Sequence, residues 1–284
     1  MTPLLRPGDR VVVVSPAGSV PAGRTAVDDG VAVLRSWGLD AVTGAHARDV
    51  HPTLPYLAGL DADRASDLVA AWLDPSVRGV LCARGGYGSQ RVVDLVDWAA
   101  LVAAGPKVFL GSSDLTAVHD RLAGLGVVSW FGPMVATDAF LRDEVAREHC
   151  RAALLDGVVA ATGTPVAGGT ATGTAFGGTV SLLGPPPPDG AVALLEEVNE
   201  EPYRLDRMLT GLLRAGWFDR VAGIALGSWH GCGDVTAVLH DRLAPLGVPI
   251  VGDVGFGHRV GQRTVPHGAS VRIDGDTGAV AFAR

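Results

Sequence analysis

The sequence has few cysteines and no long apolar run. Its 284 residues include three cysteines, which lie far apart without Cys-x-x-Cys spacing. Neither a disulfide framework nor a zinc knuckle is expected, and we expect small buried side chains at Cys82, Cys150 and Cys232. No segment approaches the ~18 apolar residues of a membrane span. Charged and turn residues at the start also interrupt any signal-peptide pattern, so we expect a cytoplasmic protein with no membrane partner.

Basic residues are also scarce. Lys and Arg total 23 against 30 Asp and Glu, which gives a formal net charge of -7, and the basic residues are scattered along the chain. A nucleic-acid surface needs a basic run or stripe that follows the phosphate backbone. We therefore expect no nucleic-acid partner.

The first half of the chain alternates between apolar strands and amphipathic helices. Strands separated by helices of this length predict a parallel sheet covered on both faces, in which sites gather at the carboxyl ends of the strands. The fold class is therefore predicted to be α/β, with a parallel-sheet N-terminal domain. The predicted strands are 10–15, 79–83, 108–111 and 127–130, and the predicted helices are 22–37, 61–73, 92–102 and 115–125.

The composition changes after residue 156. Residues 157–190 are rich in Gly, Thr, Ala and Pro, and they end in a proline run that cannot belong to a regular helix or a central strand. We predict a linker here, between an N-terminal domain at 1–156 and a smaller mixed α/β, β-rich domain at 191–284. The smaller domain has predicted strands at 192–198, 223–228, 249–254 and 270–273, and predicted helices at 203–215 and 236–244.

A serine follows one predicted strand at a sharp turn. Lys107-Val-Phe-Leu-Gly-Ser-Ser-Asp114 runs from an apolar strand into a helix. The hydroxyl of Ser113 would stand above the sheet, where N–H groups at the helix start can bind developing negative charge. The pattern resembles a nucleophile elbow, although it lacks the second glycine of Gly-x-Ser-x-Gly. Taken alone, the segment favours a simpler interpretation, in which Ser113 or Asp114 caps the helix.

A glycine-rich loop follows another predicted strand. In Ala83-Arg-Gly-Gly-Tyr-Gly-Ser89, the adjacent glycines let the backbone approach a ligand and present N–H groups, as an oxyanion hole or a phosphate cradle requires. A tight turn that needs positive φ explains the same glycines. The run lacks the full Gly-x-Gly-x-x-Gly spacing and the P-loop ending, so nucleotide binding is only weakly indicated.

Carboxylates and a histidine follow predicted strands in the second half. In Leu194-Leu-Glu-Glu-Val198, two carboxylates stand at the end of an apolar strand. In Gly255-Phe-Gly-His258, a histidine lies in a glycine-flanked loop that follows another strand. A serine needs a base to remove its proton, and an imidazole needs an acceptor on its other nitrogen. Ser, Glu and His in this order meet that requirement. The local sequence does not single out His258 from seven others, which are His46, His51, His119, His149, His230, His240 and His267.

A metal site is not expected from these residues. His230 and Cys232 are close in sequence, but a zinc site needs a second pair of ligands, and the sequence offers none nearby. The other histidines are expected to lie on the surface or to be hydrogen-bonded in the core.

Seven motifs together resemble the LD-carboxypeptidase family of serine peptidases, whose relatives include the microcin C self-immunity peptidases. The motifs occur in the family's order and cover nearly the whole chain. They are Leu5-Arg-Pro-Gly-Asp-Arg10, Ser15-Pro-Ala-Gly18, Tyr56-Leu-Ala-Gly59, Ala83-Arg-Gly-Gly-Tyr-Gly88, Gly111-Ser-Ser-Asp114, Leu195-Glu-Glu-Val-Asn-Glu-Glu-Pro-Tyr-Arg204 and Gly257-His258.

The resemblance implies a catalytic triad contributed by both halves of the chain. Ser113 matches the family nucleophile, Glu196 the acid that orients the histidine, and His258 the general base. The reaction needs no metal or other cofactor. The resemblance also implies a homodimer.

Other positions carry over as binding residues. The backbone N–H groups of Gly86 and Asp114 match the family's oxyanion donors, and Gly85 is a near-equal candidate. Arg204 and Glu197 are expected near the substrate.

The implied substrate is a murein tetrapeptide, from which the enzyme removes the terminal D-alanine during cell-wall recycling in the cytoplasm. Two alternatives stay open: a microcin C-type peptidase that cleaves a peptidyl or aminoacyl nucleotide, and a non-catalytic muropeptide- or nucleotide-binding protein on the same scaffold. The passage from Gly177 to the proline run is shorter than in the family, and Ser112 stands where an aromatic residue is usual. Asn199 stands where glycine is common. The changes at Ser112 and Asn199 are both expected to reshape the pocket.

Overall fold

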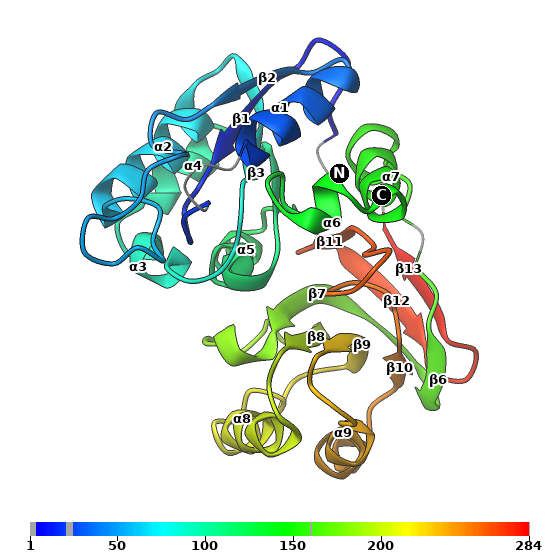
Figure 1. Cartoon of the computed structure of the whole chain (residues 1–284). Helices are drawn as coiled ribbons and strands as arrows, with labels where there is room; N and C mark the ends of the chain where they lie inside the picture. The colour runs from blue at the N-terminus through cyan, green and yellow to red at the C-terminus, as the bar shows by residue number, and fades with distance from the viewer. Residues whose placement is uncertain (1–3, 21–24, 160, 284) are drawn as a thin grey trace.

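The chain folds into two sheet-containing halves (Figure 1). This computed structural model describes residues 4–20, 25–159 and 161–283. The N-terminal half is an α/β body, and the C-terminal half is a β-rich body with two helices at its far end. No helix within the described ranges is both long enough and apolar enough to cross a membrane.

Five parallel strands and one antiparallel strand form the first sheet, in the order β11-β5-β4-β3-β1-β2. The antiparallel strand β11 comes from the far end of the chain and pairs with β5. The predicted parallel sheet is therefore confirmed, and the C-terminal half completes its edge. The strands are β1 (Arg10–Val14), β2 (Asp40–Thr43), β3 (Val77–Cys82), β4 (Val108–Gly111), β5 (Ser129–Phe131) and β11 (Val265–His267).

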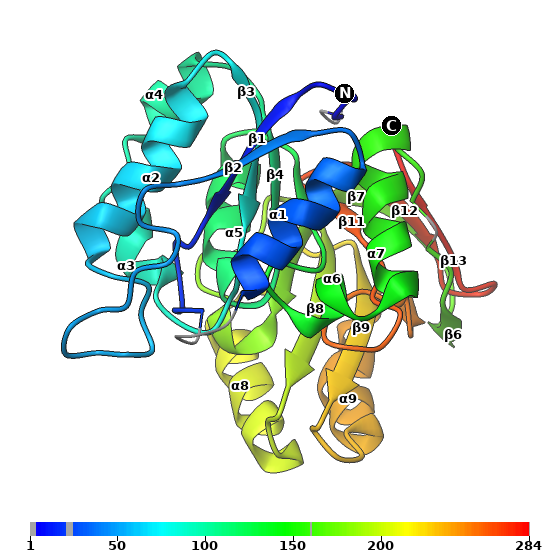
Figure 2. The ribbon, with the colours of Figure 1, turned by 45° about the horizontal axis from the view of Figure 1, so that its top comes forward.

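Helices cover both faces of this sheet because its strands are apolar on both sides. In β1, Val11 and Val13 join a core cluster with α1, whereas Val12 and Val14 join a second cluster with α2. Figure 2 shows α1 crossing in front of the strands. The helices are α1 (Ala26–Ser36), α2 (Asp61–Leu73), α3 (Ser89–Val93), α4 (Trp98–Ala103), α5 (Thr116–Gly124), α6 (Asp138–Leu141) and α7 (Glu144–Arg151), with shorter turns η1 (Ser113–Leu115) and η2 (Ala152–Asp156).

Two helix predictions in this half need comment. The prediction of a single helix at 92–102 is wrong, because the chain forms α3 and α4 instead. Asp97 begins the second helix by accepting a hydrogen bond from the N–H of Ala100 at 3.1 Å. The helix predicted at 22–37 is observed from Ala26, and residues 22–24 lie outside the described residues. The three cysteines are buried, as expected, and none of them is in a disulfide.

The second sheet has seven strands in the order β13-β12-β7-β8-β9-β10-β6. Its four central strands are parallel and its outer strands are antiparallel, so the predicted mixed, β-rich domain is confirmed. The elements are β6 (Thr164–Ala167), β7 (Thr170–Thr179), η3 (Val180–Leu182), β8 (Val192–Val198), α8 (Pro202–Arg214), β9 (Gly223–His230), α9 (Thr236–Leu243), η4 (Ala244–Leu246), β10 (Ile250–Gly252), β12 (Ser270–Asp274) and β13 (Ala279–Phe282).

The segment predicted as a linker contains two strands of this sheet, β6 and β7. A Cβ on Gly178 would lie 2.6 Å from Oγ1 of Thr116, so the absence of a side chain lets β7 approach α5. The N–H of Thr179 donates to the same Thr116 oxygen at 3.2 Å. This contact joins the two halves directly behind the turn that carries Ser113. The domain boundaries at 156 and 191 remain a prediction.

Candidate active site

Ser113 occupies a strained turn between β4 and α5. Its φ is 57°, in the left-handed region that non-glycine residues rarely adopt. A Cβ on Gly111 would lie 2.9 Å from the side chain of Leu115, so glycine is needed for the chain to turn this sharply. Neither η1 nor α5 has a side-chain cap hydrogen bond. The local sequence therefore folds as a strand, a turn and a helix, and the helix-cap interpretation is wrong.

Asp114 connects this turn to the glycine-rich loop. Its buried carboxylate accepts a hydrogen bond from the N–H of Ser89 at 2.7 Å, and the Ser89 hydroxyl donates to the Asp114 carbonyl. Burial raises the pKa of the Asp114 carboxyl, and the hydrogen bonds from Ser89 and Gly88 oppose that shift. The start of α3 is thereby fixed against the start of α5.

The glycine-rich loop lies against Ser113. A Cβ on Gly85 would stand 3.0 Å from the Ser113 Cβ and 3.3 Å from its Oγ, so a side chain there would press on the hydroxyl. The N–H of Gly18 holds the loop by donating to the Gly85 carbonyl at 2.9 Å. Gly86 follows with a φ of 96°. This is the neighbourhood that an oxyanion hole requires, and the assignment of its donors to Gly86 and Asp114 stays a prediction.

Glu196 and His258 form a hydrogen-bonded pair in the other half. Nδ1 of His258 lies 2.8 Å from Oε2 of Glu196, and the His258 N–H donates to the same oxygen at 3.2 Å. The hydroxyl of Thr179 donates to Oε1 of Glu196. Burial lowers the pKa of His258, but the hydrogen bond and charge of Glu196 raise it more, so the pKa lies above its ordinary value. The carboxylate therefore orients the ring and favours its protonated form.

The backbone around this pair explains how the two side chains meet. Glu196 lies at a register shift near the end of β8, and its side chain is completely buried. A Cβ on Gly257 would lie 2.6 Å from Oε2 of Glu196, so only glycine lets the His258 loop pass this closely. Gly257 also has a φ of 92°.

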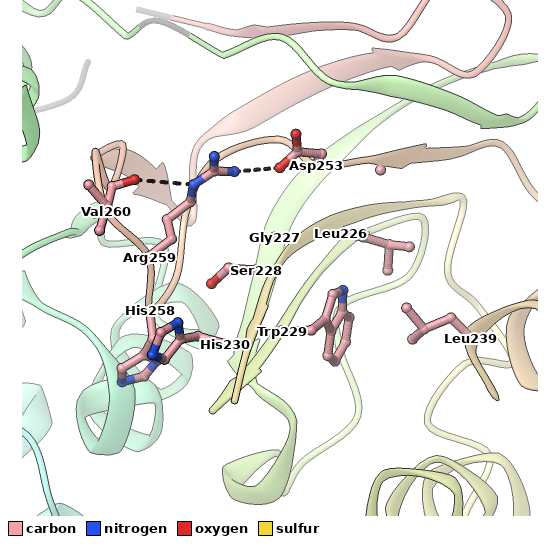
Figure 3. A pocket seen from close by; sticks show the side chains of 11 residues that line it. Leu226, Gly227, Ser228, Trp229, His230, Leu239, Asp253, His258, Arg259 and Val260 are labelled. Carbon is pink, nitrogen blue, oxygen red and sulfur yellow. Dashed lines mark hydrogen bonds and ion pairs between the residues drawn. The ribbon is translucent and has the colours of Figure 1, made fainter. Parts of the chain in front are cut away.

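Two pockets meet at His258. The Ser112 pocket, of about 720 Å³, extends from Ser112 and Met134 to α6, α7 and His258. The Trp229 pocket, of about 500 Å³, lies beside Ser228, Trp229 and Leu239. Figure 3 shows the second pocket from close by. The residues that line both pockets are His230, His258, Arg259 and Val260.

The structure brings the serine turn and the Glu196–His258 pair to one pocket. Ser112 and His258 both line the Ser112 pocket. Within the described ranges, the Ser113 hydroxyl donates no hydrogen bond to His258 or to any other group. In enzymes without substrate, such bonds are often long and shorten only in the complex.

Two residues predicted near the substrate line neither of these pockets. The carboxylate of Glu197 is buried and accepts hydrogen bonds from the N–H groups of Ser181 at 2.7 Å and Val198 at 2.9 Å. Burial raises its pKa, and these bonds oppose the shift. Arg204 is exposed on α8, with a carboxylate oxygen of Glu200 at 3.6 Å. Their roles in substrate binding stay predictions.

A buried group of titratable side chains lies behind the serine turn. His119 on α5 contacts the Gly111 carbonyl through Nε2 at 3.1 Å and the Ser129 hydroxyl through Nδ1 at 2.7 Å. His267 on β11 lies 3.0 Å from the Gly177 carbonyl and 3.3 Å from a carboxylate oxygen of Asp120. The sequence singled out none of these roles, because His267 reaches His119 and Asp120 on α5 only when the halves pack together.

One surface group could hold a metal ion. Ligand atoms of His46, Asp49 and Asp63 lie within 4.8 Å of one another. None of the three lines either pocket, and exposed acidic groups often lie together without an ion. His230 and Cys232, the pair noted in the sequence, are not arranged as metal ligands. The sulfur of Cys232 contacts the backbone carbonyl of His230 at 3.6 Å.

Comparison with known proteins covers both halves of the chain. Residues 11–132 match the LD-carboxypeptidase N-terminal domain, and residues 162–273 match the LD-carboxypeptidase C-terminal domain. A Streptomyces coelicolor protein, named a carboxypeptidase by inference, is 49% identical over 99% of this chain and 95% of its own length. The murein tetrapeptide carboxypeptidase of Pseudomonas aeruginosa is 28% identical over 94% of each chain.

Solved structures show the same architecture. The muramoyltetrapeptide carboxypeptidase of Oxalobacter formigenes superposes with a TM-score of 0.83 at 26% identity, covering 96% of this chain and 97% of its own. MccF, solved with glutamyl sulfamoyl guanosine, superposes with a TM-score of 0.88 at 19% identity, covering 100% of this chain and 98% of its own. The likeness to MccF concerns the fold alone.

Proposed function

The chain belongs to the LD-carboxypeptidase family of serine hydrolases, and on this premise we propose that it removes the terminal D-alanine from murein tetrapeptides by hydrolysing an L,D-peptide bond. The observation that carries the proposal is the hydrogen bond between buried Glu196 and half-buried His258, which lines a pocket that Ser112 also lines. Ser113 is the nucleophile in this proposal. Its strained backbone and its contact with the glycine-rich loop support that role.

The proposed mechanism assigns one task to each group. Nε2 of His258 removes the Ser113 proton as the hydroxyl oxygen attacks the scissile carbonyl, and Glu196 stabilises the resulting imidazolium. The N–H groups of Gly86 and Asp114 bind the oxyanion. His258 then returns the proton to the leaving amine, D-alanine departs, and water hydrolyses the acyl-enzyme by the same route.

The choice of substrate rests on relatives. Two proteins with murein tetrapeptide or muramoyltetrapeptide carboxypeptidase in their names align with nearly the whole chain. A murein tetrapeptide is a small peptide, and the Ser112 pocket of about 720 Å³ has the size of typical small-ligand pockets. Cytoplasmic muropeptide recycling and a homodimer complete the proposal, both from the family resemblance.

The test is to incubate the purified protein with murein tetrapeptide and, separately, with an aminoacyl sulfamoyl adenylate, and to follow products by mass. We expect release of D-alanine from the tetrapeptide alone. Ser113→Ala should lower kcat by at least about 10⁴-fold, because the nucleophile is lost. Ser66→Ala, an exposed serine on α2, is the matched control.

Three results would contradict the proposal. Hydrolysis of only the adenylate would assign a microcin C-type activity, and binding of the tetrapeptide without any turnover would assign a binding protein. Full turnover by Ser113→Ala would remove this serine from the mechanism.

A further inference from the structure

His230 lies next to His258 where the Ser112 pocket and the Trp229 pocket meet. Both histidines line both pockets, and Figure 3 shows their rings in the same corner. His230 ends β9, where it is the register partner of Val198, two residues beyond Glu196. The adjacent ends of two parallel strands therefore bring His230 to the edge that carries the Glu196–His258 pair.

The backbone of His230 is held firmly. Its carbonyl accepts a hydrogen bond from the N–H of Asn199 at 2.8 Å. A Cβ on Gly231 would lie 2.2 Å from Oδ1 of Asn199, so the turns after β8 and β9 fit together only with glycine there. The Cα of His230 is thus fixed relative to the strand that carries Glu196, as a ligand-binding residue requires.

The described residues provide no partner for the His230 ring, in contrast to the His230 backbone. The side chain is exposed, and among the described residues it has no hydrogen bond or ion pair. A neutral imidazole has one N–H donor and one acceptor, and the protonated form has two donors. The proposed mechanism makes no use of this capacity, which is therefore available to a ligand.

The chemistry of a carboxypeptidase says which ligand group belongs beside His258. The enzyme releases a residue with a free carboxylate, and His258 protonates the amine of that residue. The carboxylate and the amine are attached to the same Cα, so the carboxylate must also lie near His258. Its recognition needs a donor there, because a buried or half-buried carboxylate without a hydrogen bond is unfavourable.

The two arginines of the Ser112 pocket suit this position less well. Arg259 pairs with Asp253, and Figure 3 shows its side chain extended towards that carboxylate. Arg142 is 77% exposed and lies 3.4 Å from Asp138 on α6. The α6 and α7 side of the pocket also carries Asp138, Asp143 and Glu144, whose charges repel a carboxylate.

We propose that His230 binds the carboxylate of the leaving residue by donating an imidazole N–H, and so restricts the enzyme to peptides with a free C-terminus. This makes His230 a specificity-determining residue. The inference rests on the proposed function, since it takes His258 as the group that protonates the leaving amine.

The experiment compares an L,D-tetrapeptide with the same peptide amidated at its C-terminus. Steady-state kinetics give kcat and KM for the wild type, His230→Leu and His230→Gln. Binding of both peptides to Ser113→Ala, with and without His230→Leu, gives the same comparison without turnover. The matched control is His240→Leu, because His240 is exposed on α9 and lines neither pocket.

We expect His230→Leu to raise KM for the free acid by about 10- to 100-fold, as the loss of a hydrogen bond to a charged group predicts. The constants for the amide should not change, kcat for the free acid should change less than about threefold, and His230→Gln should recover part of the loss through its N–H donor. Equal effects on both peptides, or none on the free acid, would overturn the role of His230. If the wild type releases no D-alanine, the proposed function itself fails.

Discussion

Ser113 is one of three non-glycine residues in the described ranges with positive φ, at 57°. A left-handed conformation costs a side-chain-bearing residue roughly 1–2 kcal/mol. The turn is closely packed, because Gly111 lies against the side chain of Leu115 and Gly85 lies against Ser113. The strain therefore belongs to the position and not to the hydroxyl.

This predicts that two substitutions of Ser113 differ in stability although both abolish activity. Ser113→Gly should be more stable than Ser113→Ala by about 0.5–1 kcal/mol, because glycine adopts positive φ without strain. Both variants should lack turnover. Urea unfolding measures the difference, and a glycine variant less stable than the alanine variant would contradict strain at this residue.

Gly85 gives a second prediction at the same scale. Gly85→Ala should lower kcat by about 10- to 100-fold, because its Cβ would displace the Ser113 hydroxyl from the attacking geometry. Its control is Gly124→Ala at the end of α5, where a Cβ meets nothing within 4 Å. Circular dichroism and kcat measurements separate misfolding from displacement, and unchanged kcat in a folded Gly85→Ala would contradict the prediction.

The pKa of His258 gives a third prediction at the residue scale. In the proposed mechanism His258 acts as the base in its neutral form, and its pKa is raised above 6.5. We therefore expect kcat/KM to increase with pH through a midpoint above that value. Glu196→Gln removes the charge that raises the pKa while burial still lowers it, so the midpoint should move to lower pH along with a lower rate. A pH profile with an unmoved midpoint would show that another group titrates.

At the scale of elements, β7 and β11 pack against α5 through the buried group of His119, Asp120 and His267. Burial lowers the pKa of His267 from 6.5 to about 4 and that of His119 well below its ordinary value. Burial raises the pKa of Asp120 well above its ordinary value. The interface therefore favours uncharged imidazoles.

This predicts a loss of stability in mild acid. A histidine whose pKa is lower in the folded state contributes stability that is complete above pH 6.5 and is lost as the pH falls towards 4. For His267 the change is about 3 kcal/mol. His267→Leu should flatten this dependence, because it removes the imidazole that the folded state keeps unprotonated. Asp120 stays in place in this variant, since its raised pKa contributes in the opposite sense. Urea unfolding between pH 7 and pH 4 is the measurement, and equal slopes in both proteins would contradict it.

Some elements were predictable from sequence and others were not. α2, β4 and β8 have the residue bounds predicted, because each has a strong local periodicity or an apolar run. β7 lacks such a run, since its Gly and Thr residues are strand-forming only through pairing with β8 and β12. β11 is three residues long and is defined by its partner β5.

The same distinction applies to the site. Ser113 and its turn are encoded locally, and Glu196 and His258 were chosen through family resemblance. His230 was considered only as a metal ligand. Its place next to His258 depends on β9 lying beside β8 and on a loop that brings back a residue 28 positions later in the sequence. Only the folded chain makes these residues neighbours.

For the molecule as a whole, β11 joins the first sheet while β10 and β12 on either side of it belong to the second. The chain therefore passes between the halves three times, once after α7 and twice around β11. We expect urea unfolding to be a single transition, coincident by tryptophan fluorescence and far-ultraviolet circular dichroism. Two separated transitions would show that the halves unfold independently.

The segment from β10 to β11 carries His258, and each of its ends is anchored in a different sheet. This segment therefore bridges the two halves, and it carries the residue that acts as base in the proposed mechanism. The position of the imidazole therefore depends on how the two halves pack against each other. A substitution that loosens this packing should lower kcat even where it contacts no part of the peptide.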